Sequence, residues 1–321
     1  MVRFILFLSN PRRISKIDYS DNWLLKEIMN LLTQKIINWL KKFSMLVAIK
    51  RRFDSVRYGT DYTIFHSMPL FAPFSSGSYK DRAYLTLQAA NQTFPRLVHL
   101  LEQVTEAKLT VVKAIDFPQS AIELNAALLL KTHLDLNGSD KANLHNYHLI
   151  YGPILNRIKN INSILEIGLG TNNTDVVSNM GEGRRGLPGA SVRAFRDFLP
   201  NALIYGADID KRILFEEDRI RTYFVDQTDF QSLLDLSFKI PEKLDMIIDD
   251  GLHSPHANIA VVSFALDKLK PEGWLIIEDI SEDAIPLWQI VASILSSTYH
   301  TNLVAAEGGF VFLAQKMMTV K

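Results

Sequence analysis

Cysteine is missing from all 321 residues of the chain. This absence excludes disulfide bridges, thiolate metal sites and a cysteine nucleophile, so a bound metal needs oxygen and nitrogen ligands. Long hydrophobic runs are missing as well. The apolar stretch at 4–8 is soon followed by Asn10 and Pro11, and it is too short for the apolar region of a signal peptide or for a membrane span of about 20 residues. These absences predict a cytoplasmic protein.

The chain also lacks an overall surplus of either charge, because 35 Lys and Arg balance 35 Asp and Glu. The balance hides an uneven distribution. Residues 1–60 carry 12 Lys and Arg against 4 Asp and Glu, a net charge of +8, which leaves −8 for the remainder. An acidic body without a basic, aromatic-lined groove argues against a nucleic-acid substrate. The hydrophobic content of 47% is enough for a core that folds by burial alone.

The first 60 residues are predicted to form a basic amphipathic segment. Between Trp23 and Phe43, apolar residues recur at steps of three and four, with lysines among them. Three interpretations of this helix stay open. It packs on its own protein, it contacts a membrane surface or a protein partner, or it belongs to a translated segment upstream of a true start at Met45.

Residues 61–140 are predicted to form a loop and a helical accessory region. The loop at 61–80 contains Pro69, Pro73 and a run of serines and glycine at 75–78. A helical pattern follows from about Tyr79 to Leu136 and is broken by the polar residues 137–140.

After residue 140, short apolar runs alternate with helical stretches, which predicts an α/β domain over residues 141–321 with a parallel sheet covered on both faces. Two further runs, separated by Glu307-Gly308-Gly309, predict a terminal antiparallel hairpin. Seven strands are therefore expected, at Ser163–Ile167, Leu203–Ala207, Thr222–Val225, Asp245–Ile248, Trp274–Ile277, Asn302–Ala306 and Phe310–Ala314.

The first expected strand ends in Glu166, Gly168 and Gly170. Glycines in this position let the backbone turn sharply and approach a ligand, although a simple strand-to-helix turn would use them too. Asn172 stands where a dinucleotide site would have its third glycine, and a polar insertion at 173–188 delays the next helix. The missing phosphate cradle disfavours NAD. Glu166 suits a cationic portion of a ligand.

The next two strand ends carry further candidate binding residues. Asp208, with Asp210 as a fallback, is placed to accept hydrogen bonds from the two hydroxyls of an adenosine ribose. Asp226 could accept from an adenine amino group and Gln227 could contact the ring edge. Alternatively, Thr228 or Asp229 simply caps the following helix.

In order along the chain, LEIGLGTNN, GASVRAFRDFLPNALIYGADID, IRTYFVDQTD, DMIIDDGLHSPHANI and LKPEGWLIIEDI resemble the Rossmann-like class I methyltransferases that use S-adenosylmethionine. Within that class, the closest likeness is to the metal-dependent sugar O-methyltransferases of the macrolide-tailoring type and to the cephalosporin-hydroxylase-like group. The resemblance covers about residues 140–321. His145, Tyr147 and Tyr151 resemble that group's H-x-Y-x-x-x-Y segment, which is often near the cofactor.

The resemblance implies a seven-stranded Rossmann-like sheet with a mainly helical region before it, and a cofactor site for S-adenosylmethionine. It implies Asp250, Glu278 and Asp279 as ligands of a divalent metal, with Mg²⁺ the expected ion because carboxylate oxygens suit it. His253, with Asp250, would be catalytic as the general base. Asp249 would lie behind the metal or face the cofactor. The implied cofactor-binding residues are Glu166, Gly168, Gly170, Thr171, Asp208, Asp226, Gln227, Asp249 and Tyr147.

The predicted reaction is methyl transfer to a hydroxyl of a sugar-like small molecule, by a protein expected to be a homo-oligomer. Two other interpretations stay open, a hydroxylase-like enzyme of the same fold and a non-catalytic scaffold that keeps the cofactor pocket. A structural alternative makes Asp249 or Asp250 the cap of a helix near Pro255, with His253 a loop residue. Leu252 and the residues 171–173 depart from the group's pattern, and these departures affect which acceptor is expected. The pair Arg184-Arg185 could be a solvated loop tip or could bind an anionic acceptor.

Overall fold

The computed structural model describes residues 45, 48–50, 52–54, 56–57, 59–60, 62–64, 78–105, 109–181 and 186–318. The expected helix at 23–43 and the Arg184-Arg185 pair lie outside this set. The chain divides into two compact units, Met1–Gln92 and Thr93–Lys321. The domain boundaries expected at residues 60 and 140 stay predictions.

Helix α3 (Tyr79–Val104) begins in the first unit and ends in the second. Its start is set by Ser78, whose hydroxyl accepts a hydrogen bond from the backbone N–H of Asp81 at 3.1 Å and donates to the Asp81 carboxylate at 2.6 Å. Within the described part of the chain, no helix combines the length and the apolar character needed to cross a bilayer.

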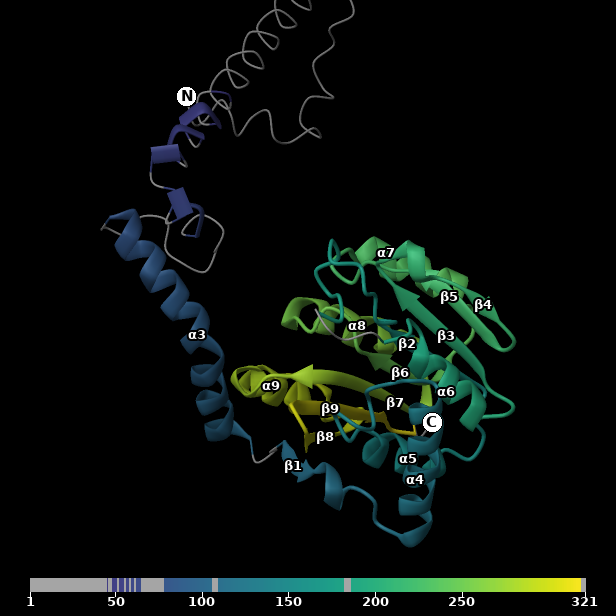
Figure 1. The fold of residues 1–321 in the computed structure, drawn as a ribbon. Coiled ribbons are helices and arrows are strands. Elements are labelled where there is room, and N and C mark those ends of the chain that lie inside the picture. Colours follow the sequence, from purple (N-terminus) through teal and green to yellow (C-terminus); the bar gives the residue numbers. More distant parts are fainter. Residues whose placement is uncertain are drawn as a thin grey trace, which may run out of the picture. The chain divides into compact units, whose positions relative to one another are not determined.

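The second unit contains one nine-stranded sheet with the order β1-β8-β9-β7-β6-β2-β3-β5-β4 (Figure 1). The strands are β1 (Thr110–Lys113), β2 (Ser163–Ile167), β3 (Leu203–Asp208), β4 (Glu216–Glu217), β5 (Ile220–Phe224), β6 (Leu244–Asp249), β7 (Leu269–Ile280), β8 (Tyr299–Ala306) and β9 (Gly309–Lys316). The helices are α4 (Ala121–Leu136), α5 (His148–Arg157), α6 (Ala190–Phe198), α7 (Phe230–Lys239), α8 (Pro255–Lys268) and α9 (Ile285–Leu295), with short 3₁₀ turns η2 (Ala114–Asp116), η3 (Lys211–Ile213) and η4 (Glu282–Ala284).

The seven predicted strands form the continuous middle of this sheet, and the predicted α/β class is confirmed. The terminal hairpin is the β8–β9 pair, which turns through Glu307 and Gly308. Two strands were not predicted. Strand β1 adds four mostly exposed residues parallel to β8, and β4 adds two residues antiparallel to β5. Both are too short and too exposed to show an apolar pattern.

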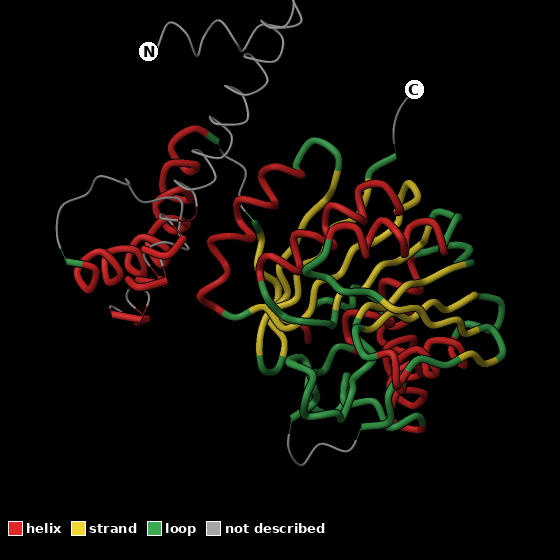
Figure 2. The backbone as a smooth tube through the Cα atoms, turned by 90° about the horizontal axis from the view of Figure 1, so that it is seen from above, coloured by secondary structure: helices red, strands yellow, loops and turns green. Residues whose placement is uncertain are grey.

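Helices cover both faces of the sheet (Figure 2). Helices α4, α5 and α6 pack on one face through Leu130, Ile154 and Phe195, while α7, α8 and α9 pack on the other through residues such as Leu236 and Trp288. A strand buried on both faces reads as a continuous apolar run, which is why β2 and β6 were visible in the sequence.

The strand order reverses its direction between β2 and β6. From β2 the chain builds outward through β3 and β5, and then returns to place β6 and β7 on the other side of β2. These five strands are parallel, so their carboxyl ends open at one edge of the sheet. In open α/β sheets, ligands bind in the crevice at such a reversal.

Candidate active site

A cavity of about 780 Å³ lies at this edge and is lined by the carboxyl end of β7 and by residues at or just after the ends of β2, β3, β5 and β6. Its wall includes Gly168, Asp208, Asp226, Asp250 and Asp279. Residues predicted from five separate strand ends thus meet around one space. The volume is in the range of cavities that hold a cofactor or a small-molecule substrate.

Gly168 allows a close approach between the end of β2 and the end of β6. Its φ is +99°, and a Cβ added there would lie 1.9 Å from the backbone oxygen of Asp250. The Asp250 N–H in turn donates to Ile167 O at 2.8 Å. Gly170 also has a positive φ, and a Cβ on it would lie 2.8 Å from the sulfur of Met180. Gly168 requires glycine for both its backbone conformation and the space beside it, whereas Gly170 requires it for its positive φ, because the flexible Met180 side chain can move.

Glu166 and Thr171, both predicted to bind the cofactor, are buried behind this turn and do not line the cavity. The hydroxyl of Ser191 donates to Glu166 at 2.7 Å. Burial raises the pKa of Glu166 above its usual range. The Thr171 hydroxyl donates to Asp210 at 2.6 Å, which ties the loop after β2 to the loop after β3.

Asp208 lines the cavity, and both of its oxygens accept backbone hydrogen bonds. Leu169 N–H donates to one oxygen at 2.7 Å and Asp210 N–H to the other at 2.8 Å. Burial raises the pKa of Asp208, against the effect of these hydrogen bonds. The fallback residue Asp210 forms an ion pair with Arg212 at 2.7 Å, which together with its other hydrogen bonds lowers the pKa of Asp210.

Gln227 is held at both ends of its amide. Its NH₂ group donates to Asp249 at 2.6 Å, and its carbonyl accepts from Leu252 N–H at 2.9 Å. Asp249 is fully buried, accepts a second bond from Asn258 at 2.9 Å and does not line the cavity. Gln227 therefore fixes the loop that leads from β6 to His253.

The structure shows which of the candidate residues cap the helices α7 and α8. Asp229 caps α7 by accepting from Gln231 N–H at 3.0 Å. Asp226 accepts from the Thr228 N–H at 2.9 Å and from its hydroxyl at 2.7 Å. The residue at the N-terminus of α8 is Ser254, so neither Asp249 nor Asp250 caps that helix.

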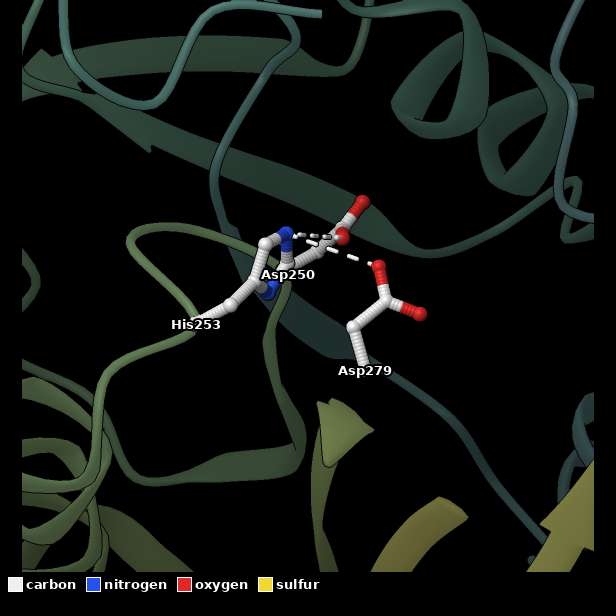
Figure 3. Close-up of side chains that lie close together, drawn as sticks. All are labelled: Asp250, His253 and Asp279. Atoms are coloured by element: carbon white, nitrogen blue, oxygen red, sulfur yellow. Dashed lines mark ion pairs between the residues drawn. The ribbon is translucent and has the colours of Figure 1, made fainter. Parts of the chain in front are cut away.

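Asp250, His253 and Asp279 come together in the part of the cavity lining that β6 and β7 supply (Figure 3). His253 Nε2 lies 3.7 Å from Asp250 Oδ1 and 3.5 Å from Asp279 Oδ2. One potential ligand atom from each of the three residues lies within 4.8 Å of the other two. His253 and Asp279 both have left-handed backbones, with φ of 51° and 53°. Such conformations are uncommon outside glycine and gather at functional sites.

Lys141 is a central residue of the site that sequence reasoning missed. Its side chain is 3% exposed, and its ammonium lies 2.6 Å from Asp250 Oδ2, 2.6 Å from Glu278 Oε2 and 3.2 Å from Glu166 Oε1. Burial alone would lower the pKa of Lys141, but these carboxylates outweigh it and raise the pKa well above its usual value. At Asp250, burial acts to raise the pKa, but the nearby Lys141 and His253 outweigh burial and lower the pKa below its usual value.

Glu278 is placed differently from Asp250 and Asp279, although the resemblance implies all three as metal ligands. Its carboxylate is 1% exposed and accepts from Lys141 through both oxygens and from the Tyr151 hydroxyl. Burial and the neighbouring Asp250 raise the pKa of Glu278 well above its usual value. Glu278 therefore belongs to a buried ion cluster that lines the same cavity as Asp250 and Asp279.

Tyr147 lines the cavity and donates its hydroxyl to Asp279 Oδ1. Its ring stacks on His145, with the ring centroids 5.1 Å apart. His145 Nδ1 lies 3.8 Å from the same Asp279 oxygen. The segment before α5 thus contacts one carboxylate oxygen of Asp279, and His253 faces the other.

Part of the chain is similar in sequence to known O-methyltransferases. No protein-family model matches the chain. It is 30% identical over 157 residues to 8-demethyl-8-alpha-L-rhamnosyl tetracenomycin-C 2'-O-methyltransferase of Streptomyces olivaceus, covering 48% of this chain and 38% of that protein. It is also 34% identical over 93 residues to demethylmacrocin O-methyltransferase of Streptomyces fradiae, covering 29% of this chain and 23% of that protein. The chain is related to class I O-methyltransferases.

The chain spans less than two fifths of the length of each of these two methyltransferases. The solved MycE methyltransferase from the mycinamycin pathway, in complex with Mg, SAH and mycinamycin VI, aligns with a TM-score of 0.47 and 21% identity, covering 59% of this chain and 53% of that chain. The strand order divides the cavity lining into two sides about the end of β2. Asp208 and Asp226 come from β3 and the loop after β5 on one side, and Asp250, His253 and Asp279 come from β7 and the loop after β6 on the other.

Proposed function

We propose that the protein is an S-adenosylmethionine-dependent O-methyltransferase that methylates a hydroxyl of a sugar or glycosylated small molecule. The observation that carries the proposal is the meeting of Asp250, Asp279 and His253 beside a cavity at the strand-order reversal. The kinship with sugar O-methyltransferases supports the reaction class. Oligomer formation and a membrane or partner contact through the N-terminal helix stay predictions.

The residues present fit both expected ligands. The cavity has room for S-adenosylmethionine, with Asp208 at the end of β3 where a ribose is bound in related folds. Asp250 Oδ1 and Asp279 Oδ2 face the same imidazole nitrogen, and oxygen ligands of this kind suit Mg²⁺, which keeps several waters in its shell. Asp250, Asp279 and Glu278, all of which line the cavity, would hold the metal.

The chemistry requires an activated oxygen. S-adenosylmethionine supplies a methyl group on a sulfonium leaving group, and Mg²⁺ supplies positive charge near the acceptor oxygen. His253 is placed to accept the proton of the acceptor hydroxyl, because its nitrogen lies beside both carboxylates and its side chain is 37% exposed toward the cavity. Tyr147 and Gln227 keep Asp279 and the His253 loop in position.

Two substitutions test the two sides of the cavity lining separately. Asp208→Asn should weaken S-adenosylmethionine binding by roughly tenfold or more, because its buried carboxylate holds the backbone that faces the cofactor. Asp250→Asn should leave cofactor binding within about twofold and lower turnover by roughly a hundredfold or more. Calorimetry with the cofactor and radiolabelled methyl transfer to a panel of glycosides measure the two effects.

Asp218→Asn is the matched control, because the Asp218 side chain is 89% exposed and lies outside the cavity. It should behave as the parent in both assays. Absence of cofactor binding by the parent protein would remove the proposed function. Equal loss of cofactor affinity in the Asp208 and Asp250 variants would refute the division of the cavity lining into these two sides.

A further inference from the structure

Part of the cavity wall is formed by residues 171–180, here called the insertion segment, which lie in no helix or strand. Six consecutive members of this segment, residues 175–180, line the cavity. A segment outside regular secondary structure has no ladder of backbone hydrogen bonds to hold it, so its position depends on other contacts. Because the insertion segment is part of the wall, those contacts also determine the shape of the space beside the end of β3.

Asp210, at the N-terminus of η3, anchors the beginning of the insertion segment. Its carboxylate is 3% exposed, and one oxygen accepts from the Thr171 hydroxyl and from the Asn173 amide, both at 2.6 Å. The same carboxylate accepts from the Arg212 guanidinium at 2.7 and 3.0 Å. The side chain of Asp210 is therefore engaged by donors of the chain itself, and its buried position makes it a fixed point on β3's side of the cavity.

Arg212 connects this fixed point to the middle of the insertion segment. Besides Asp210, its guanidinium donates to the Asp175 carboxylate at 2.9 and 3.2 Å. A planar guanidinium carries enough N–H groups to bind two carboxylates at once, which a lysine ammonium does with less geometric definition. The side chains of Arg212 and Asp175 are 52% and 70% exposed, so the bridge is in contact with water and can open.

We propose that Arg212 is a positioning residue that holds the insertion segment against Asp210 and thereby shapes the part of the cavity that binds the cofactor. The inference rests on the proposed function, because it takes S-adenosylmethionine as the ligand. Without the bridge the insertion segment also adopts arrangements in which the wall is not formed, and the cofactor binds only to the fraction of molecules in which it is. The affinity for Mg²⁺ should stay unchanged, because the metal carboxylates come from the ends of β6 and β7.

Hydrogen exchange of the full chain, followed by mass spectrometry, tests the bridge without any ligand. The Met180 N–H donates to Thr171 O at 2.9 Å, so exchange of this amide reports opening of the insertion segment. Arg212→Gln should speed exchange of peptides that cover residues 171–181 by roughly fivefold, and Asp175→Asn should act in the same direction. Peptides from the rest of the sheet should exchange as in the parent.

Calorimetry then measures the consequence for the cofactor. Arg212→Gln should weaken S-adenosylmethionine binding by roughly fivefold and leave Mg²⁺ binding within about twofold, a difference that a general loss of structure would not produce. The double variant Arg212→Gln/Asp175→Asn should bind the cofactor no more weakly than Arg212→Gln alone, because both substitutions break the same bridge. Arg221→Gln is the matched control, since the Arg221 side chain is 43% exposed and lies outside the cavity. It should change neither exchange nor affinity.

The proposal is overturned if Arg212→Gln leaves the exchange of residues 171–181 as in the parent, or if exchange becomes faster while the cofactor binds as tightly as before. Losses of affinity that multiply in the double variant also overturn it, because they would indicate two independent contacts with the cofactor. A parent that binds no S-adenosylmethionine would remove the proposed function together with this inference. A parent that binds it, with Arg212→Gln equally tight, would remove this inference alone.

Discussion

Gly168 offers a test of the turn at the residue scale. Gly168 and Gly138 both have a positive φ, of 99° and 75°, but an added Cβ meets the backbone of Asp250 at Gly168 and nothing within 4 Å at Gly138. Gly138→Ala should therefore cost about 1 kcal/mol of stability. Gly168→Ala should cost roughly 1–3 kcal/mol more, because the ends of β2 and β6 have to separate. Urea denaturation measures both, and equal losses would contradict the close approach.

Single residues also show where sequence reasoning stops. The carboxylates at strand ends were predictable, because each follows an apolar run directly. Lys141 was not, since its partners Asp250 and Glu278 lie 109 and 137 positions further along the chain. Its one local signal is a lysine four residues before His145, which is too weak to separate a buried cation from a solvated one. The role of Gln227 depends equally on a distant partner, Asp249.

At the scale of elements, α4 and α5 are tied by one ion pair. Arg157 donates to the two oxygens of Glu123 at 2.8 and 3.0 Å. These hydrogen bonds hold the pKa of Glu123 below its ordinary value of 4.5. A carboxyl with a lowered folded-state pKa stabilises the protein above its unfolded pKa and loses that contribution as the pH falls.

Glu123→Gln should consequently lower stability by about 1–2 kcal/mol at pH 7. The difference from the parent should shrink as the pH falls below about 4.5. Thermal unfolding of both proteins between pH 7 and pH 3.5 follows the effect. A difference that grows toward acid pH would show that the ion pair does not act as described.

The elements themselves were predicted to different degrees. The strands β2 and β6, buried on both faces, differ from prediction by at most one residue at each end. Strand β7 was predicted as four residues but extends over twelve. Its first part was missed because it contains Pro271 and Gly273 and lacks an apolar pattern. Strand β1 forms only because β8 offers it a parallel edge, a condition that no local pattern contains.

At the scale of the whole molecule, ligand binding should stabilise the unit that holds the cavity. S-adenosylmethionine at about 100 times its dissociation constant adds about 2.7 kcal/mol to the free energy of unfolding, equivalent to a rise in Tm of roughly 5–10 °C. NAD is the control, since Asn172 stands where a dinucleotide site would have its third glycine. Thermal shift measurements compare the two, and a larger rise with NAD would reverse the assignment of the cavity.

The position of β9 limits the order in which the sheet can assemble. Although it comes last among the strands of the described residues, it pairs with β7 on one side and β8 on the other. Strands β8 and β1 therefore reach the rest of the sheet only through it. On the ribosome, the edge of β7 stays open until residues 309–316 have emerged from the exit tunnel, so a nascent chain has to keep that edge from pairing with other polypeptides.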